Sequence, residues 1–141
     1  MKEVHTEVEI NASAKKVWGI ISDFQKYGEW NPFITHVQGE PKEGSKITID
    51  VRTPAGAHRT YNPKITKAEQ DKELRWVGKI PGVISGEHIF IITGQPGNNR
   101  VRFVNKEVFG GLLSSFFGSS IDDIRASFEQ MNHALKKRAE G

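Results

Sequence analysis

The sequence contains no cysteine among its 141 residues. That absence excludes disulfide bonds, thiolate metal sites and cysteine nucleophiles. The sequence also has no apolar run of about 18 residues, so no membrane-spanning helix is expected. The opening stretch, MKEVHTEVEI, alternates in polarity and carries acidic side chains, which is not the pattern of a signal peptide. Together these absences predict a cytoplasmic protein that folds without covalent cross-links.

Several signatures of catalysis and cofactor binding are missing as well. There is no P-loop, no G-x-S-x-G motif and no G-x-G-x-x-G motif. The five histidines are too dispersed for metal-ligand spacing. Asp122 and Asp123 suit the first turn of a helix better than a catalytic pair. We therefore expect no metal and no cofactor.

Composition and charge indicate one ordinary globular domain over residues 1–141. The hydrophobic fraction of 36% and the charged fraction of 26% are usual for a folded chain of this length. The formal net charge is +3, and the basic residues are scattered except for Lys136, Lys137 and Arg138. The macrodipole favours cations at the end of a helix, which we prefer over binding to nucleic acid or a membrane surface. No nucleic-acid partner is expected.

Hydrophobic periodicity predicts an α+β fold. Residues 2–10 alternate as a half-buried strand, and both Asn11 and Ser13 are suitable N-caps for the helix that follows. A second short helix is expected over residues 23–27. Five or six strands then follow, separated by turns rich in Gly, Pro and Asn, over residues 33–40, 45–53, 59–69, 72–80, 83–93 and 99–109. Their short links predict an antiparallel meander.

The last part of the chain changes to helical periodicity. Apolar residues recur at spacings of three and four from Leu112 to Leu135, which is typical of an amphipathic helix. This helix begins either at Leu112, with a bend, or near Ser119, and it ends near Ala139. Because no other element is long enough to cover the apolar face of the sheet, we expect the helix to pack against it.

His88 lies in an otherwise apolar strand, in the segment GEHIF. Pairing residues 72–80 with residues 83–93 places Trp76 opposite His88. Pairing the next two strands about positions 96–97 places His88 opposite Asn105, with Glu107 diagonal to the histidine. The sequence thus predicts a row of Trp76, His88 and Asn105 on the inward face of the sheet.

Three explanations of this polar row are open. The side chains of His88, Asn105 and Glu107 satisfy one another, since an unpaired buried polar group costs about 1–3 kcal/mol. Alternatively they orient a ligand in an apolar cavity, or His88 and Glu107 act as an acid–base pair. Gly78 and Gly86 are expected to face each other beside the row. They remove side-chain volume and slightly favour a cavity, although they also suit a bend in the sheet.

Several segments resemble the polyketide cyclase/dehydrase-like branch of the START/Bet v 1-like (SRPBCC) superfamily. They are INASAKKVWGIISDFQKYGEWNPFI, LRWVGKI, GEHIF and NRVRFVNKEVFGGLL, and the resemblance extends over about residues 3–138. It implies a helix-grip fold: a seven-stranded curved antiparallel sheet wrapped on a long C-terminal helix, two short helices after the first strand, and a deep hydrophobic cavity. The glycine-rich loop of the plant allergen branch is missing. The superfamily shares no catalytic set, so the resemblance assigns no catalytic residue.

Members similar to this chain bind lipids, sterols, polyketides or other apolar molecules, and some are cyclases, hydrolases or chaperone cofactors. The leading hypothesis is therefore a domain that binds a small hydrophobic or amphipathic ligand between the sheet and the C-terminal helix. The residues expected to line this cavity are Trp30, Tyr61, Trp76, His88, Phe90, Phe103, Asn105, Glu107, Phe117 and Ile121.

Two other classes of function are kept as alternatives. The first is a cyclase or dehydratase in which His88 acts as general acid or base and Glu107 orients it, while Asn105 or Tyr61 polarises a carbonyl. The second is a protein-interaction module of the chaperone-cofactor type. Its contact surface would be the basic outer face of the sheet, formed by Arg75, Lys79, Arg102 and Lys106.

Overall fold

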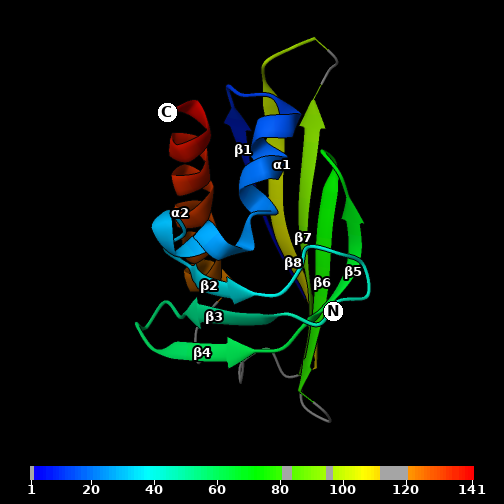
Figure 1. Cartoon of the computed structure of the whole chain (residues 1–141). Helices are drawn as coiled ribbons and strands as arrows, with labels where there is room; N and C mark the ends of the chain where they lie inside the picture. Colours follow the sequence, from blue (N-terminus) through cyan, green and yellow to red (C-terminus); the bar gives the residue numbers. More distant parts are fainter. Residues whose placement is uncertain (1, 81–83, 95–96, 112–120) are drawn as a thin grey trace.

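The computed structural model describes residues 2–80, 84–94, 97–111 and 121–141 (Figure 1). The elements in chain order are β1 (Lys2–Ile10), α1 (Ala14–Ile21), the 3-10 helix η1 (Phe24–Glu29), β2 (Ile34–Gln38), β3 (Thr48–Arg52), β4 (His58–Tyr61), β5 (Lys64–Glu69), β6 (Glu73–Ile80), β7 (Ile84–Gly94), β8 (Val101–Gly111) and α2 (Ile121–Glu140). This order matches the predicted strand, two short helices, run of strands and long final helix.

The described strands form two antiparallel sheets. The five-stranded sheet has the order β1-β8-β7-β6-β5, and the three-stranded sheet has the order β2-β3-β4. Strand β1 lies at one edge and pairs only with β8, from Lys2 opposite Phe109 to Ile10 opposite Val101. Figure 1 shows the strands of the smaller sheet running across those of the larger one, below α1 and α2.

The number of strands differs from the expected seven, because the described residues contain eight. The predicted strand over residues 59–69 is divided into β4 and β5 at Asn62 and Pro63. Proline has no N–H to donate to a neighbouring strand, so it interrupts the ladder. The two sheets remain joined beside this break, where Lys46 and Lys64 form an isolated bridge and the N–H of Ile47 donates to the carbonyl of Pro63.

The register of the central hairpin agrees with the sequence, and that of the next hairpin does not. Trp76 lies opposite His88 and Gly78 opposite Gly86, as predicted. His88, however, lies opposite Glu107 rather than Asn105, because Val101 faces Gly94 instead of Ile92 and the turn is centred one residue later than expected. The shift is two residues, and side chains alternate with a period of two. The predicted faces are therefore preserved.

Helix α2 covers the concave side of the larger sheet. It packs against β1 and β8, while α1 packs against α2 and β7. The buried apolar side chains of α2 recur at helical spacing: Ile124, Phe128, Met131, Leu135 and Ala139. This stripe confirms the predicted amphipathic helix. The prediction that it starts at Leu112 or near Ser119 falls on residues outside those described.

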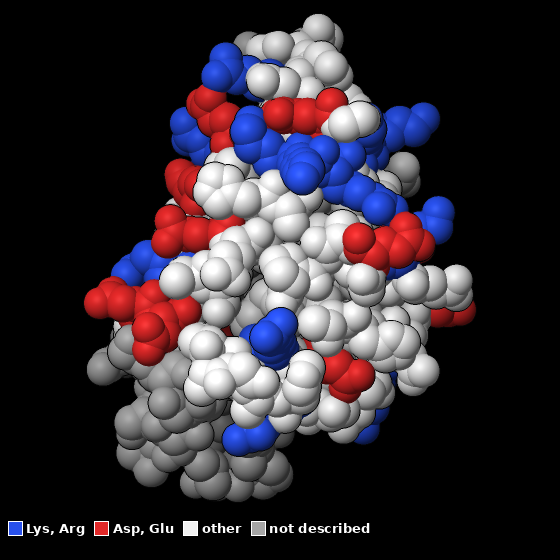
Figure 2. All heavy atoms as spheres, turned by 90° about the vertical axis from the view of Figure 1, so that its left-hand side faces the viewer, with Lys and Arg blue, Asp and Glu red and all other residues white. Residues whose placement is uncertain are grey.

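The charges on the α2 side of the molecule are mixed (Figure 2). Blue and red side chains alternate across this face, with the basic ones gathered toward one end. At the C-terminal end of α2, Lys136 pairs with Glu140 at 2.6 Å and Arg138 pairs with Glu29 at 2.8 Å. Basic residues in the last turn and Asp122 and Asp123 in the first turn fit the macrodipole explanation.

Candidate functional site

The predicted polar side chains lie together on the inward face of the five-stranded sheet. β6 supplies Trp76, β7 supplies His88, and β8 supplies both Asn105 and Glu107. All four are buried, and Asn105 is completely inaccessible. Glu107 is the most exposed to solvent, because its side chain is 11% exposed against 4% for that of His88. Glu107 is thus the exposed end of the group.

Both ring nitrogens of His88 have partners. Its Nδ1 lies 3.1 Å from Oε1 of Glu107, and its Nε2 lies 2.7 Å from Oδ1 of Asn105. The histidine therefore has no free nitrogen with which to contact a ligand. Glu107 is directly opposite His88 on the neighbouring strand, whereas Asn105 reaches it diagonally.

Two residues that sequence analysis did not propose extend the network. The Nδ2 of Asn105 donates to Oδ1 of Asn132 at 3.0 Å, and the Nδ2 of Asn132 donates to Oγ1 of Thr6 at 2.9 Å. The hydroxyl of Thr6 donates in turn to the backbone carbonyl of Asn105 at 2.7 Å. One signal for Asn132 was present: it lies four residues after Phe128, on the apolar stripe of α2. A polar residue at such a position needs a buried partner.

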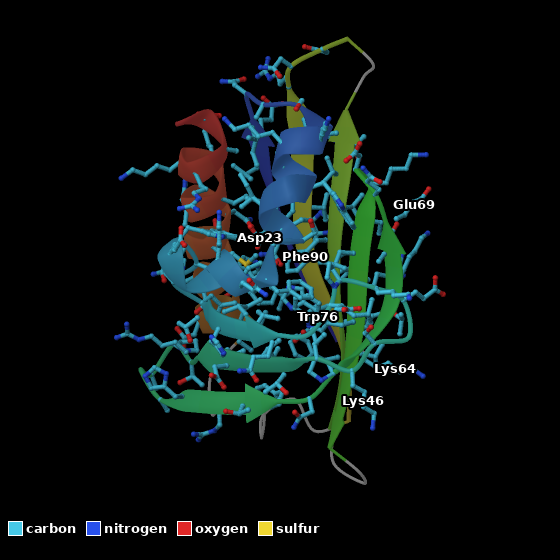
Figure 3. All side chains as sticks on the ribbon, viewed as in Figure 1. Asp23, Lys46, Lys64, Glu69, Trp76 and Phe90 are labelled. Carbon is cyan, nitrogen blue, oxygen red and sulfur yellow. The ribbon has the colours of Figure 1, made fainter. Side chains whose placement is uncertain are left out.

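Aromatic rings surround His88. The ring centroid of His88 lies 5.0 Å from that of Phe128 on α2, 4.6 Å from that of Phe90 and 5.5 Å from that of Trp76. Phe90 in turn stacks on Phe103 at 5.7 Å. Figure 3 shows Trp76 and Phe90 on the side of the sheet that faces the helices. The polar network is therefore set in an aromatic wall, as expected for a site that takes an apolar molecule.

Two facing glycines lie near the network, and one of them, Gly86, is next to Glu107. Gly78 and Gly86 face each other on β6 and β7. A Cβ added to Gly86 would lie 3.5 Å from Cδ and 3.6 Å from Oε2 of Glu107, and one added to Gly78 would lie 3.9 Å from Cβ of Pro63. These are ordinary contact distances, so either backbone position accepts a side chain. The absence of a side chain at Gly86 therefore leaves room for at least a methyl group next to the carboxylate.

The remaining predicted site residues lie in different places. Tyr61 ends β4 and is half-buried; burial raises the pKa of its hydroxyl, Arg59 lowers it and Glu107 raises it again. Trp30 packs against the core from the end of η1, and its buried Nε1 has no hydrogen-bond partner among the described residues. Ile121 is partly buried at the start of α2. Phe117 lies outside the described residues.

Two surface pockets lined by described residues each have a volume of about 450 Å³. One lies at the β5–β6 turn and the end of β7, with Asp71, Ile92 and Val101 among its lining residues. The other lies between the smaller sheet and α2, with Phe33 and Ser127 among its lining residues. Neither is lined by His88 or Glu107, so neither coincides with the predicted row.

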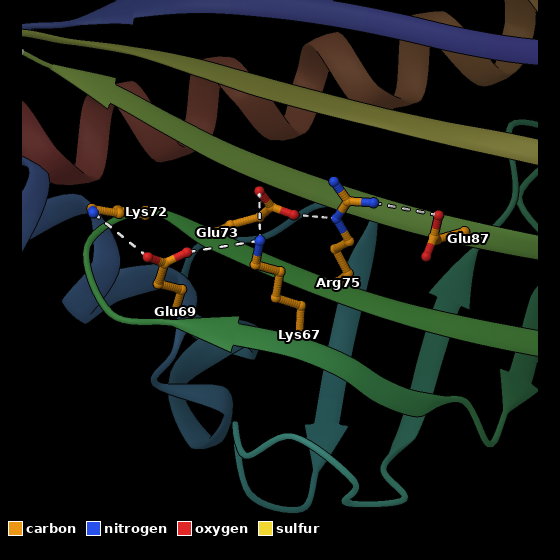
Figure 4. Close-up of polar contacts among 6 residues, drawn as sticks. All are labelled: Lys67, Glu69, Lys72, Glu73, Arg75 and Glu87. Atoms are coloured by element: carbon orange, nitrogen blue, oxygen red, sulfur yellow. Dashed lines mark hydrogen bonds and ion pairs between the residues drawn. The ribbon is translucent and has the colours of Figure 1, made fainter.

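The outer face of the larger sheet carries both signs of charge. Figure 4 shows a ladder of alternating ion pairs across β5, β6 and β7, formed by Lys72, Glu69, Lys67, Glu73, Arg75 and Glu87. Lys106 likewise pairs with Glu3 at 3.6 Å. Two of the four cations proposed as a basic contact surface, Arg75 and Lys106, therefore have acidic partners. Exposed pairs of this kind are worth about 0–1 kcal/mol each.

Two kinds of site are not found in the described part of the chain. Its His, Asp and Glu side chains nowhere cluster in a group that could hold a metal ion. None of the helices in residues 2–80, 84–94, 97–111 and 121–141 is long and apolar enough to span a bilayer.

Comparisons with known proteins place the chain in a family. A family model described as polyketide cyclase / dehydrase and lipid transport matches residues 1–140. No curated protein matches the sequence. The chain is similar to the solved structure of a START superfamily protein from Mycobacterium smegmatis, at 20% identity and a TM-score of 0.74, covering 98% of this chain and 97% of the other.

Two further solved structures show the same likeness. One is a protein from Helicobacter pylori, with 16% identity, a TM-score of 0.77, and coverage of 98% of this chain and 88% of the other. The second is the di-domain ARO/CYC StfQ from the steffimycin biosynthetic pathway, with 14% identity, a TM-score of 0.66, and coverage of 98% and 51%. This chain thus spans about half of that di-domain protein. At such identities the likeness establishes the START-like fold alone.

Proposed function

Because the chain belongs to the polyketide cyclase/dehydrase and lipid transport family, we propose that it binds a small hydrophobic or amphipathic molecule between the five-stranded sheet and α2. The ligand is a lipid, sterol, polyketide or aromatic compound. Its apolar part packs against the wall formed by Trp76, Phe90 and Phe128, and its polar end reaches Glu107.

The observation that carries this proposal is the position of Glu107. Its side chain is 11% exposed next to an aromatic interior, and Gly86 lies beside its carboxylate. Burying a carboxylate is costly unless it is paired, and among the described residues His88 pairs with Oε1 of Glu107. In the proposed site the other oxygen, Oε2, faces the bound molecule and interacts with its polar end.

Filling the glycine space tests the proposal. Wild type is screened by thermal shift and native mass spectrometry against fatty alcohols, fatty acids, sterols and polycyclic aromatics. A ligand present at about 100 times its Kd stabilises the folded state by about 2.7 kcal/mol, so at least one class is expected to raise the Tm of wild type. Gly86→Leu is expected to lose this shift, because its side chain occupies the volume beside Glu107.

Gly19→Leu is the matched control. It introduces the same side chain on α1, where an added Cβ meets nothing within 4 Å. It is expected to keep the ligand-induced shift. Gly86→Ala replaces Gly86→Leu in the test if the leucine variant fails to fold. Its Cβ fits at contact distance from Glu107 and occupies less of the space than leucine does. Absence of any shift across the panel in wild type, or equal shifts in wild type and a folded Gly86→Leu protein, would contradict the proposal.

The contact between His88 and Glu107 favours a second candidate, an acid–base enzyme of the dehydratase or cyclase type. Since both nitrogens of His88 are occupied, Glu107 is the group that would take a proton from a substrate carbon and return it to a departing hydroxyl, releasing water. Asn105 is unsuited to polarise a carbonyl, because its amide nitrogen already donates to Oδ1 of Asn132 and to Sδ of Met131. Mass spectrometry of the panel after incubation separates the candidates: unchanged ligands indicate binding, and loss of one water indicates turnover.

A further inference from the structure

The direction of each hydrogen bond in the buried network is set by one backbone atom. The carbonyl oxygen of Asn105 can only accept, so the hydroxyl of Thr6 must donate to it. Having used its single proton, Oγ1 of Thr6 must accept from the amide nitrogen of Asn132. The Oδ1 of Asn132 therefore faces Asn105 and accepts from its Nδ2. Both amide orientations follow without any free choice.

This direction fixes the protonation of His88. The Oδ1 of Asn105 is turned toward the ring and accepts, so Nε2 carries a proton. The Nδ1 atom lies 3.1 Å from Oε1 of Glu107. Two lone pairs at that distance repel, so one proton lies between them, either as imidazolium with carboxylate or as neutral imidazole with carboxylic acid. Both arrangements carry the same number of protons.

Both protonation arrangements leave the same atom, Oε2 of Glu107, to interact with a ligand. In each of them Oε1 of Glu107 is engaged with His88, and Oε2 has no proton. This second oxygen lies 3.6 Å from the position that a Cβ would take at Gly86, on the side where the glycine leaves space. The atom beside Gly86 is therefore a hydrogen-bond acceptor, whichever partner holds the shared proton.

We infer that the site selects a ligand whose polar end donates a hydrogen bond, namely a hydroxyl or an amine, and rejects one that ends in a free carboxylate. This inference rests on the proposed function and specifies its ligand class. A hydroxyl donates to Oε2, whereas a carboxylate sets a second acceptor against it. Asn132, Asn105 and His88 act as positioning residues, because they hold Glu107 through the ring without contacting the ligand.

Three probes of similar length test the inference: decanol, nonyl methyl ether and decanoate. The ether has the same number of heavy atoms as the alcohol but cannot donate. Dissociation constants are measured by calorimetry at neutral pH. Wild type is expected to bind decanol about tenfold more tightly than the ether, because the ether leaves the buried acceptor without a donor. Decanoate is expected to bind more weakly still, because it sets a second acceptor against Oε2.

Glu107→Gln is the decisive variant, because its amide can present either a donor or an acceptor. The preference for decanol over decanoate is expected to fall about tenfold or more in it. Glu87→Gln is the matched control. Glu87 is next to His88 on β7, but its side chain faces the outer surface and pairs with Arg75. It is expected to keep the wild-type preference.

The outcomes separate the two proposals. Equal affinity of wild type for decanol and decanoate, or a preference that survives in Glu107→Gln, would overturn the inference and leave ligand binding intact. Failure of all three probes and of the whole ligand panel would overturn the proposed function, and the inference with it. The protonation of His88 has its own readout if Glu107→Gln does not fold. Nitrogen-15 NMR of wild type is expected to show a proton on Nε2, and a bare Nε2 would contradict the assignment.

Discussion

Thr6 joins three elements of the fold through a single hydroxyl. It donates to the backbone of β8 and accepts from Asn132 of α2, although it lies on β1. Replacing it by valine keeps the shape and removes both hydrogen bonds. We expect Thr6→Val to lower the free energy of unfolding by about 1–3 kcal/mol, because the amide of Asn132 is then buried without a partner.

Urea denaturation measures this effect, and Thr60→Val is its control. Thr60 is exposed on β4 and its hydroxyl donates to Asp50 at the surface, so the same chemical change there should cost within about 0.5 kcal/mol. Equal losses in the two variants would show that the buried network contributes no special stability. A loss confined to Thr6→Val would also support the hydrogen-bond directions on which the protonation of His88 depends.

At the residue scale, the sequence predicted on which face of the sheet a side chain lies better than it predicted which residue lies opposite it. Alternation along each strand was enough to place Trp76, His88, Asn105 and Glu107 on the inward side. It was not enough to pair them, because the register of β7 with β8 depends on the length of the turn between them. Asn132 was not identified, because periodicity shows which face of a helix is buried but not which residues of the sheet that face contacts.

At the scale of elements, helix α1 depends on its first residue. The Oγ of Ser13 accepts a hydrogen bond from the backbone N–H of Lys16 at 3.1 Å, in the manner of an N-cap. The helix is only eight residues long, and isolated helices of that length are not stable. Ser13→Ala is therefore expected to lower the free energy of unfolding by about 1 kcal/mol.

Ser13→Asp is the matched control for the cap. Aspartate offers the same acceptor at the same position and is also favoured by the helix macrodipole, so it should retain wild-type stability. Both variants are compared by urea denaturation followed by circular dichroism. A loss in Ser13→Asp equal to that in Ser13→Ala would mean that packing of the serine, rather than its hydrogen bond, matters.

The boundaries of helices and strands were predicted only in part from N-cap and turn residues. Of the two N-cap residues predicted, Asn11 and Ser13, it is Ser13 that begins α1. The break between β4 and β5 was not predicted, although Pro63 has no N–H to donate to a neighbouring strand. Pro63 ends the ladder while its carbonyl still accepts from Ile47, so the chain passes from one sheet to the other without losing that hydrogen bond.

At the scale of the whole molecule, two carboxylates tie distant segments together. Glu140 accepts from the backbone N–H of Asn11 at 2.8 Å and from Lys136, and these contacts lower the pKa of its carboxyl. The hydrogen bond from Arg138 lowers the pKa of Glu29 in the same way. A lowered pKa in the folded state means stability that is present above the ordinary value of 4.5 and is lost as the pH falls through the folded-state pKa.

We therefore expect Glu140→Gln to be less stable than wild type at neutral pH. The difference should shrink as the pH falls below 4.5 and disappear in stronger acid, where the wild-type carboxyl is protonated. Denaturation curves recorded across this range check the expectation. Glu40→Gln, an exposed change in the β2–β3 connection, is the control and should show no such convergence. A constant difference for Glu140→Gln at all pH values would contradict the linkage.

The pairing of β1 with β8 also determines when the protein can fold during synthesis. Thr6 and the carbonyl it binds on β8 are 99 residues apart in the chain. The ribosome therefore releases the first strand long before the strand that completes its ladder, and α2, which covers both, emerges last. Until then the apolar side of β1 has no native partner, so we expect nascent chains that end before β8 to depend on chaperones rather than fold progressively.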